Sequence, residues 1–390
     1  MKWKFYSLAF VAGMSILTAC SSDDNNDNDG NGGNGNGNEI ENGTILKGTI
    51  TSDVTLAAGN TYKLSGEYIV EEGATLHIEE GVKIIAVYDD IADYILVKQG
   101  GKINAVGTPD KPIVMNSEKE EPGAWGGIHI CGRAHTNAEG GKGSSEIGGA
   151  VYGGNDDADN SGTLQYIRLE YTGFAFDEEH EANGISFYGV GNGTIVDHCQ
   201  AYKGSDDGFE FFGGSVNVSN LVAVSCSDDS FDWTEGWNGK GTNLVAYQEA
   251  ESTLGYDCDC LMECDNNGSN NAATPVAHPV LKNLILVGNG GSKQGIRLRA
   301  GTEVEIDNAK VCGKGQPLTV ETALTENALK NGTSKLTNIT LTSELSSKEG
   351  IYTHADFIAV TSNKVDANLS YSSFEDIRKE CSWMNGSWVK

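Results

Sequence analysis

The sequence is poor in basic residues and lacks the short motifs of several enzyme classes. Its 390 residues include 27 Lys and Arg against 55 Asp and Glu, so the formal net charge is −28 at pH 7. A chain this acidic repels nucleic acid, and no basic run is present to bind a phosphate backbone. It has no Walker loop, GxSxG elbow or dinucleotide fingerprint. The charge balance favours divalent cations and cationic partners instead.

The only long apolar run near the start of the chain, residues 8–17, is too short to span a membrane as a stable helix. It follows Lys2 and Lys4 and precedes the sequence LTAC, which ends at Cys20. A basic start, a short apolar core and a small residue before a cleavage point are typical of a secretion signal, here residues 1–19.

The sequence LTAC resembles the bacterial lipobox, which implies lipidation of the Cys20 thiol; an ordinary signal with a chance cysteine is the alternative. Residues 20–43 have almost no apolar side chain and predict a flexible tether. Their acidic start resembles the export signal of Bacteroidetes surface lipoproteins. This resemblance implies a body anchored by lipid to the outer membrane and exposed at the cell surface, with a periplasmic location as the alternative.

The eight cysteines that remain besides Cys20 do not follow the spacing of a zinc site. Cys258, Cys260 and Cys264 crowd together in CDCLMEC, without a second CxxC pair. Cysteines of exported chains can pair. We expect either a local disulfide or buried thiols here.

Glycine is abundant, with 51 residues against six prolines, and short strand-like runs recur at a nearly constant interval. Asn begins the runs NLVAV, NLVAY and NLILV at 220, 243 and 283, and HCQAY at 198 fits the same position. A second series consists of GISFYG, GFEFFGG, SFDWTEG and GIRLRAG, which begin at 184, 208, 230 and 295. An interval of about 22 residues marks stacked coils.

Stacking makes like positions of successive coils neighbours. The second series then predicts two inward stacks, Ile185, Phe209, Phe231 and Ile296, and two residues further on Phe187, Phe211, Trp233 and Leu298. The asparagines are expected to bond their side-chain amides from coil to coil.

These coils and their asparagine ladder resemble the right-handed parallel β-helix of the pectate-lyase-like superfamily. Phrases such as GATLHIEEGVKI, AWGGIHICGRA and GVGNGTIVDH resemble still more closely a group of uncharacterised outer-membrane lipoproteins of Bacteroidetes and marine bacteria. The resemblance implies an all-β, single-stranded parallel β-helix over residues 44–313. Residues 314–390 are expected to form C-terminal coils and a cap, in which SSFEDIRKEC at 372–381 predicts a short helix over the last coil.

Acidic residues also recur one coil apart. The pairs Asp206–Asp207 and Asp228–Asp229 are expected at turns, and Glu210 and Asp232 alternate with inward aromatic residues and so point outward. Asp259 and Glu263 fit the same columns more loosely. Charges about 4.8 Å apart repel by roughly 3–4 kcal/mol at an effective dielectric of about 20.

Three arrangements relieve such repulsion. Ca²⁺ could be held by Asp206, Asp207, Asp228 and Asp229, carboxylates could stay protonated, or a base could lie beside them. Arg297 occupies the outward position of GIRLRAG in the same column, and Arg299 lies two residues further along. A base is therefore expected on this face.

Acids followed by arginines on a β-helix face resemble the sites of polygalacturonases and calcium-dependent pectate lyases. This resemblance implies Asp228, Asp229 or Asp232 as acid or base and Arg297 as charge stabiliser, although the GHG coil of polygalacturonases is missing. Glu210, Arg299 and an exposed Trp237 are the candidates to contact a sugar, whereas Trp233 is expected in the core.

The sequence therefore predicts a protein that binds an extracellular polysaccharide or oligosaccharide, with Ca²⁺ as the expected cofactor. One alternative is a polysaccharide lyase or glycoside hydrolase that uses the same face. Another is a non-catalytic, structural or accessory lipoprotein of an outer-membrane uptake complex, in which the acidic columns serve only the fold.

Overall fold

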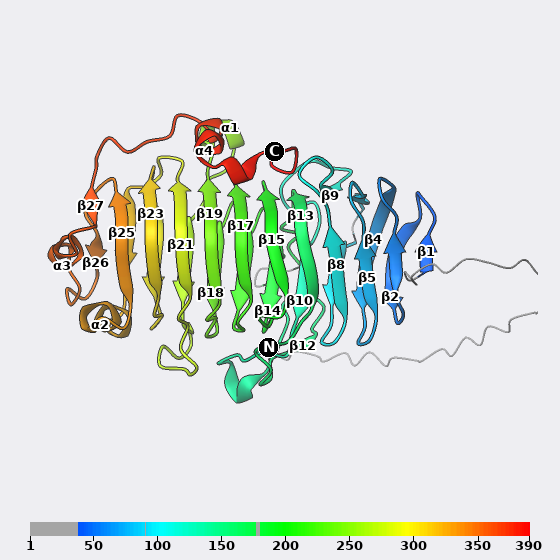
Figure 1. Cartoon of the computed structure of the whole chain (residues 1–390), viewed down its shortest axis with the longest axis horizontal. Helices are drawn as coiled ribbons and strands as arrows, with labels where there is room; N and C mark the ends of the chain where they lie inside the picture. The colour runs from blue at the N-terminus through cyan, green and yellow to red at the C-terminus, as the bar shows by residue number, and fades with distance from the viewer. Residues whose placement is uncertain (1–37, 90, 177–179) are drawn as a thin grey trace, which may run out of the picture. The chain divides into compact units, whose positions relative to one another are not determined.

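The strands of the chain run parallel and stack coil upon coil in the computed structural model, which describes residues 38–89, 91–176 and 180–390 (Figure 1). The predicted signal, Cys20 and most of the tether lie outside these residues. The first strand, Asn38–Ile40, already pairs with the coil above it, so the stack begins before the predicted boundary at residue 44.

The first coils consist mostly of short strands. They are β1 (Asn38–Ile40), β2 (Ile45–Ile50), β3 (Val54–Leu56), β4 (Thr61–Val70), β5 (Thr75–Ile78), β6 (Lys83–Ala86), β8 (Lys102–Val106) and β9 (Ile113–Ser117). The exception is β4, which is ten residues long and pairs with β6 through its first half and with β7 (Tyr94–Val97) through its second. An antiparallel pair, β11 (Gly143–Ser144) and β12 (Val151–Tyr152), lies outside the stack.

From the third coil onward, one face is built from a single short strand per coil, and we call it the short-strand face. Its strands are β7 (Tyr94–Val97), β10 (Ile128–Cys131), β14 (Ile185–Tyr188), β16 (Phe209–Phe212), β18 (Phe231–Thr234), β20 (Met262–Asp265), β22 (Gln294–Arg299), β24 (Gln316–Val320) and β26 (Ser346–Ser347). All neighbours in this series pair in parallel.

The other two faces are the two halves of long strands that bend at one residue. These strands are β13 (Gly162–Glu170), β15 (Ile195–Tyr202), β17 (Asn217–Val224), β19 (Lys240–Tyr247), β21 (Val280–Val287), β23 (Glu305–Cys312), β25 (Lys335–Leu341) and, at the end, the short β27 (Lys364–Val365). The bend requires a positive φ, which is 55° at Asn220 and 59° at Asn243 and Asn283. Asparagine tolerates this conformation better than most residues.

The predicted asparagine ladder is confirmed at these bends. The amide of Asn243 donates to Asn220 Oδ1 at 2.8 Å, that of Asn283 to Asn243 Oδ1 at 3.0 Å, and that of Asn308 to Asn283 Oδ1 at 2.8 Å. His198 occupies the same position one coil earlier, with φ of 53°. Each side-chain amide therefore donates a hydrogen bond to the asparagine one coil earlier, and these bonds fix the register of the coils.

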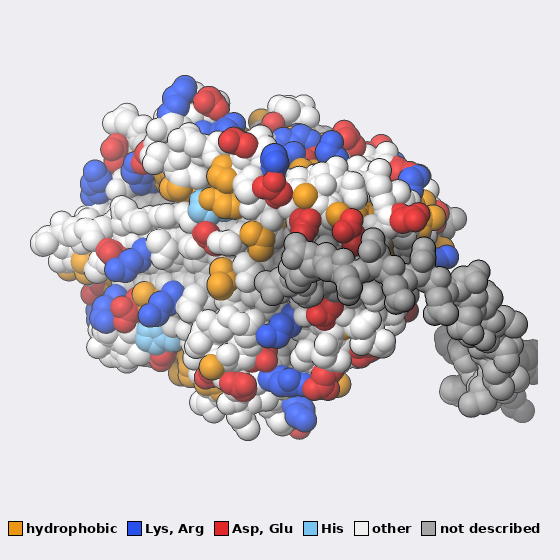
Figure 2. Space-filling model, turned by 45° about the vertical axis from the view of Figure 1, so that its right-hand side comes forward, with side chains coloured by type: hydrophobic (Ala, Val, Ile, Leu, Met, Phe, Trp, Pro, Cys, Tyr) orange, Lys and Arg blue, Asp and Glu red, His pale blue; other side chains and the backbone are white. Residues whose placement is uncertain are grey.

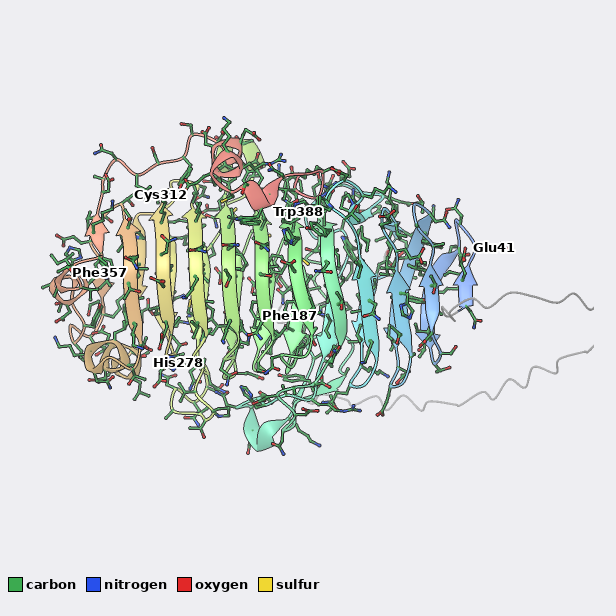
Figure 3. All side chains as sticks on the ribbon, viewed as in Figure 1. Glu41, Phe187, His278, Cys312, Phe357 and Trp388 are labelled. Carbon is green, nitrogen blue, oxygen red and sulfur yellow. The ribbon has the colours of Figure 1, made fainter. Side chains whose placement is uncertain are left out.

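The predicted inward stacks are confirmed as well. Phe209 is opposite Ile185 and Phe231, and Phe211 is opposite Phe187 and Trp233. The rings of Phe187 and Phe211 stack at 5.1 Å, and all these side chains are buried (Figure 3). Met262 and Cys264 extend the two stacks to Ile296 and Leu298. The fold is thus a right-handed parallel β-helix with a continuous apolar core.

Short helices lie outside the stack of strands. They are α1 (Glu251–Leu254), α2 (Ala323–Asn331), α3 (His354–Ala359), α4 (Phe374–Glu380), and the 3₁₀ turns η1 (Glu139–Gly141) and η2 (Ser382–Met384). The predicted helix within 372–381 is α4, with Ser373 at its N-terminus.

The C-terminal segment is not where the sequence analysis placed it. Helix α4 and the residues after it run back along the outside of the long strands instead of covering the last coil, which α2 and α3 flank (Figure 1). The reason is a stripe of outward apolar residues on the long strands, including Val222, Val245 and Ile285, against which Ile377, Met384 and Trp388 are buried. Among the described residues, no helix is long and apolar enough to cross a membrane.

Candidate functional site

One column of outward residues runs the length of the short-strand face. Strand pairing places Glu210 opposite Asp232, Asp232 opposite Glu263, and Glu263 opposite Arg297. The predicted column, including its less certain member Glu263, is therefore confirmed. Its earlier positions are Ser186 and His129, both buried.

The second aspartate of each pair accepts a hydrogen bond from a backbone N–H of the next coil. Asp207 Oδ1 accepts a hydrogen bond from the N–H of Asp229 at 2.8 Å, and Asp229 Oδ1 accepts one from the N–H of Cys260 at 2.6 Å. Both carboxyl groups are buried. Asp207 and Asp229 thus connect three successive coils at the turn before the short-strand face.

Three carboxyl groups from two coils converge beside this turn. Oxygen atoms of Asp207, Glu210 and Asp232 all lie within 4.8 Å of one another. Asp232 Oδ1 is buried and accepts no hydrogen bond from any described residue. Asn183 donates to Glu210 Oε2 at 2.5 Å, while its own buried Oδ1 also lacks a partner among these residues. The cluster therefore has acceptor oxygens that the surrounding chain does not satisfy.

Burial and mutual repulsion raise the pKa values in this cluster. Burial, followed by the nearby Glu146 and Asp232 carboxylates, raises the pKa of Glu210 well above its usual range. Burial, followed by repulsion from Glu263 and Asp265, likewise raises the pKa of Asp232, and Arg299 only partly opposes the effect. The negative charge on this cluster is thus poorly compensated by the protein itself.

The first aspartate of each pair is more accessible. Asp206 and Asp228 approach Asp207 to form a second group of three carboxyl oxygens within 4.8 Å, and Asp228 is exposed. Burial, together with the carboxylates of Asp228 and Glu181, raises the pKa of Asp206 to about 7. Asp207 belongs to both groups, so the two clusters are continuous.

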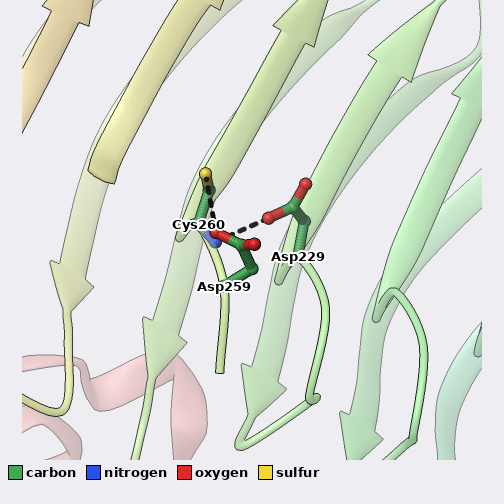
Figure 4. Close-up of side chains that lie close together, drawn as sticks. All are labelled: Asp229, Asp259 and Cys260. Carbon is green, nitrogen blue, oxygen red and sulfur yellow. Dashed lines mark hydrogen bonds between the residues drawn. The ribbon is translucent and has the colours of Figure 1, made fainter. Parts of the chain in front are cut away.

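A third group differs in chemistry. Asp229, Asp259 and Cys260 lie within 4.8 Å of one another, and the Cys260 thiol donates to Asp259 Oδ1 at 3.5 Å (Figure 4). Burial raises the pKa of that thiol, which therefore stays protonated. Asp259 also pairs with Lys293 at 2.6 Å. This end of the column is less suited to a hard cation than the all-oxygen clusters.

Arg297 lies in the predicted column and Arg299 two residues further along β22, and their attraction relieves the acidic cluster only in part. Arg297 is held by Glu263 at 2.8 Å and Glu321 at 3.3 Å. Arg299 is held by Glu263 at 2.6 Å and Asp265 at 2.7 Å. Both guanidinium groups thus pair with acids of coils further along, and the attraction of Arg299 and Lys293 opposes only part of the rise in the pKa values of Asp232 and Asp228.

Comparison with protein families identifies this architecture. A family model described as a pectate-lyase-like β-helix domain matches residues 48–389. The chain belongs to this family. Among solved structures, the Dettilon tailspike protein (gp208) matches with a TM-score of 0.31 and 9% identity, over 76% of this chain and 56% of the tailspike chain. No curated protein sequence matches.

The prediction of an exposed Trp237 in this pectate-lyase-like domain is wrong. Trp237 is 1% exposed, its ring stacks on Phe211 at 4.2 Å, and its Nε1 donates to the Val216 carbonyl at 3.2 Å. After Thr234 the chain turns inward at Gly236, where φ is 85°. Trp237 therefore completes the core beside Trp233, which is buried as predicted.

The loop after β10 carries Glu146, whose charge acts on Glu210 and Asp206, and this loop is fastened at two points. Tyr152 and Thr136 donate to Glu235 Oε2 at 2.8 and 2.7 Å, which fastens the loop after β10 to the end of β18. Asn137 donates to Asn266 Oδ1 at 2.8 Å and so joins the loop after β10 to the loop after β20. These loops supply further contacts that the repeats do not reveal.

Asn183 is the residue at the site that the sequence analysis missed. It precedes GISFYG just as Asp207 precedes GFEFFGG, so aligning the coils predicts that Asn183 lies one coil before Asp207 in the same column. Glu146 and Glu181 come from irregular segments and carry no such signal. All eight described cysteines are buried free thiols, so the second of the two expectations for Cys258, Cys260 and Cys264 holds.

Proposed function

We propose that this β-helix protein binds Ca²⁺ at the acidic clusters and, through the ion, an acidic extracellular polysaccharide. The observation that carries the proposal is the convergence of Asp207, Glu210 and Asp232 around a buried, unpartnered Asp232 Oδ1. Ca²⁺ takes six to eight oxygen ligands from carboxylates, carbonyls and water. Carboxylates that lack a neighbouring base supply such ligands.

The charge of the chain favours an ion-mediated mode of binding. A net charge of −28 repels an anionic glycan unless a cation lies between the partners. Acidic and basic side chains are interspersed on the face shown in Figure 2, and the two arginines nearest the clusters are already held by acids. A bound cation with open coordination positions would accept the carboxylate of a sugar acid.

The anchoring of the protein is part of the same proposal. The lipobox-like LTAC and the acidic tether that follows support attachment through Cys20 to the outer membrane, with the β-helix facing outward. An anchored body at the cell surface meets extracellular polysaccharide directly. Labelling with radioactive palmitate, in wild type and in Cys20→Ala, tests the anchor independently of ligand binding.

Calcium titration of the purified protein tests the central proposal. In isothermal titration calorimetry, Ca²⁺ is expected to bind wild type and to bind Asp232→Asn at least ten-fold more weakly. Glu344→Gln, a change at an exposed acid far along the chain, serves as the matched control and should bind like wild type. Polygalacturonate is then expected to bind only with Ca²⁺ present. Equal Ca²⁺ affinity of all three proteins would refute the proposal.

A polysaccharide lyase or glycoside hydrolase is the second candidate, and one observation favours it. Asp206 has a pKa of about 7 and lies beside the exposed Asp228, so one group can hold a proton while the other is ionised near neutral pH. Asp229 is less suited to this role because its carboxyl group is buried and bonded to the backbone. Release of unsaturated or reducing ends from polygalacturonate, lost in Asp206→Asn, would establish catalysis.

A further inference from the structure

A second surface of the molecule has the composition of a sugar-binding site, and it lies away from the acidic clusters. Of the tryptophans that the structure describes, Trp125, Trp233, Trp237 and Trp388 are buried, and only Trp383 is partly exposed. Trp383 packs in part against the apolar cluster of the C-terminal segment, and the rest of its ring remains accessible. Trp rings combine an apolar face with a polar N–H, which suits them to contacts with a ligand.

Trp383 borders a cavity of about 290 Å³ between the C-terminal segment and the bends of the long strands. One wall consists of Asn243, Asn283 and Asn308 of the ladder, and the other of Glu380, Cys381 and Trp383. The segment is held there by α4 and Trp388, which is buried against the strands and lies close to the ring of His198 (Figure 3). The cavity is thus a fixed part of the fold.

The ladder amides retain hydrogen-bonding capacity toward this cavity. Each asparagine donates one amide hydrogen along the ladder, which leaves its second hydrogen for another partner. Asn308 Oδ1 receives no hydrogen bond from any described residue, because Asn338 donates to Asp307 instead. Asn283 and Asn308 are exposed. The wall therefore offers a row of donors and acceptors at the spacing of the coils.

The charged groups of the cavity neutralise each other. Lys310 pairs with Glu380 at 2.5 Å, and Tyr371 donates to the other oxygen of Glu380 at 2.8 Å. A charged ligand would have to break this pair, whereas an uncharged one would not. Neutral amides beside an aromatic face match the hydroxyl groups and the apolar ring face of a sugar.

We propose that the cavity between the asparagine ladder and Trp383 binds an uncharged saccharide, with one sugar ring against the indole and its hydroxyl groups on Asn283 and Asn308. The cavity volume is at the lower end of the range for small-molecule sites, about 300–1,000 Å³, and suits a single ring. This site needs no metal ion. It is independent of the Ca²⁺ site on the short-strand face, so either proposal can fail without the other.

An array of neutral oligosaccharides of glucose, mannose, galactose and N-acetylglucosamine, probed in the presence of EDTA, tests this site. Wild type is expected to bind at least one member, and Trp383→Ala to bind it at least ten-fold more weakly. Tyr88→Ala removes another exposed aromatic ring and should bind like wild type. Trp383→Phe keeps an aromatic ring and is expected to bind with intermediate affinity.

The indole N–H signals identify the site directly. In a ¹H–¹⁵N spectrum, the signal absent from Trp383→Phe should shift when the bound oligosaccharide is added to wild type, while the signals of the buried tryptophans stay in place. The proposal is overturned if no neutral oligosaccharide binds in EDTA, if Trp383→Ala binds as tightly as wild type while remaining folded by its melting curve, or if the Trp383 signal does not shift.

Discussion

The N–H of Asp229 donates to Oδ1 of Asp207, one coil earlier, at 2.8 Å. This bond explains why the acidic pair recurs in consecutive coils: the second aspartate of each pair holds the next coil in place. Oxygen atoms of Asp207, Glu210 and Asp232 lie within 4.8 Å of one another, and Asp232 Oδ1 has no hydrogen-bond donor among the described residues. A structural ladder and a cluster of poorly compensated carboxylates are therefore built from the same repeat.

Asp232→Asn is expected to stabilise the protein in EDTA and to abolish its stabilisation by Ca²⁺. The unfolded Asp232 is ionised at neutral pH, whereas burial raises its pKa in the folded state, so folding has to bury the charge or take up a proton. Asparagine removes that cost, but it also removes a ligand of the ion. Thermal melting with and without Ca²⁺ measures both effects. Glu344→Gln is the control. Loss of stability in EDTA together with an unchanged response to Ca²⁺ would contradict this account.

Stability without Ca²⁺ is expected to decrease from pH 4 to pH 7. The pKa of Asp206 rises from 3.8 to about 7 on folding, so between these values the folded state keeps a proton that the unfolded state has lost. Stability is then highest below the unfolded pKa and falls as pH rises toward 7. Urea unfolding in EDTA at several pH values measures this slope.

Asp206→Asn should flatten that dependence over pH 4–7, because the titrating group is gone. The other buried acids, Asp207, Glu210 and Asp232, also have raised pKa values and contribute with the same sign, so some slope will remain. A stability that rises with pH in EDTA would mean that these carboxylates are compensated by groups that the cluster does not contain.

Asn283→Ala is expected to cost about 1–3 kcal/mol. It removes two ladder hydrogen bonds and forces a residue with a Cβ and no compensating side chain into a positive φ of 59°. Asn283→Gly loses the same bonds without that strain and should be about 1 kcal/mol more stable than Asn283→Ala. Equal unfolding free energies of the two variants would show that backbone strain plays no part at the bend.

Trp237→Ala is expected to cost about 3–5 kcal/mol, as large-to-small changes of buried tryptophans do. Its ring is 1% exposed and stacks on Phe211 in the core. Trp383→Ala, at a partly exposed site, is the matched comparison and should cost much less. A folded Trp237→Ala of nearly wild-type stability, measured by urea unfolding, would argue against the core position.

The repeats predicted most of the fold because each coil is stabilised by its neighbours. The inward position of Phe209 and the outward position of Glu210 follow from period-two alternation, and the register follows from equal spacing. Where a loop intervenes the periodicity is lost. The expectation of an exposed Trp237 fails for this reason, because the turn at Gly236 directs its side chain into the core.

The charge pairing of the arginines was harder to predict for a different reason. Arg297 does share a column with Glu210, but the column alone does not say which acids reach it. Glu321 lies one coil beyond Arg297 and outside the recognised repeats, and it competes for the guanidinium group. The position of Trp383 was equally hard to predict. The C-terminal segment packs on an apolar stripe of the long strands rather than on the end of the stack, and Trp383 therefore lines a cavity beside these strands.

A melting curve of the purified protein, recorded with Ca²⁺ and again with EDTA, tests the central claim most directly. A ligand that binds only the folded state raises the melting temperature with its concentration. The account predicts a rise of several degrees with Ca²⁺ that EDTA reverses and that Asp232→Asn lacks. Identical curves under the two conditions would contradict it, and the acidic clusters would then serve the fold alone.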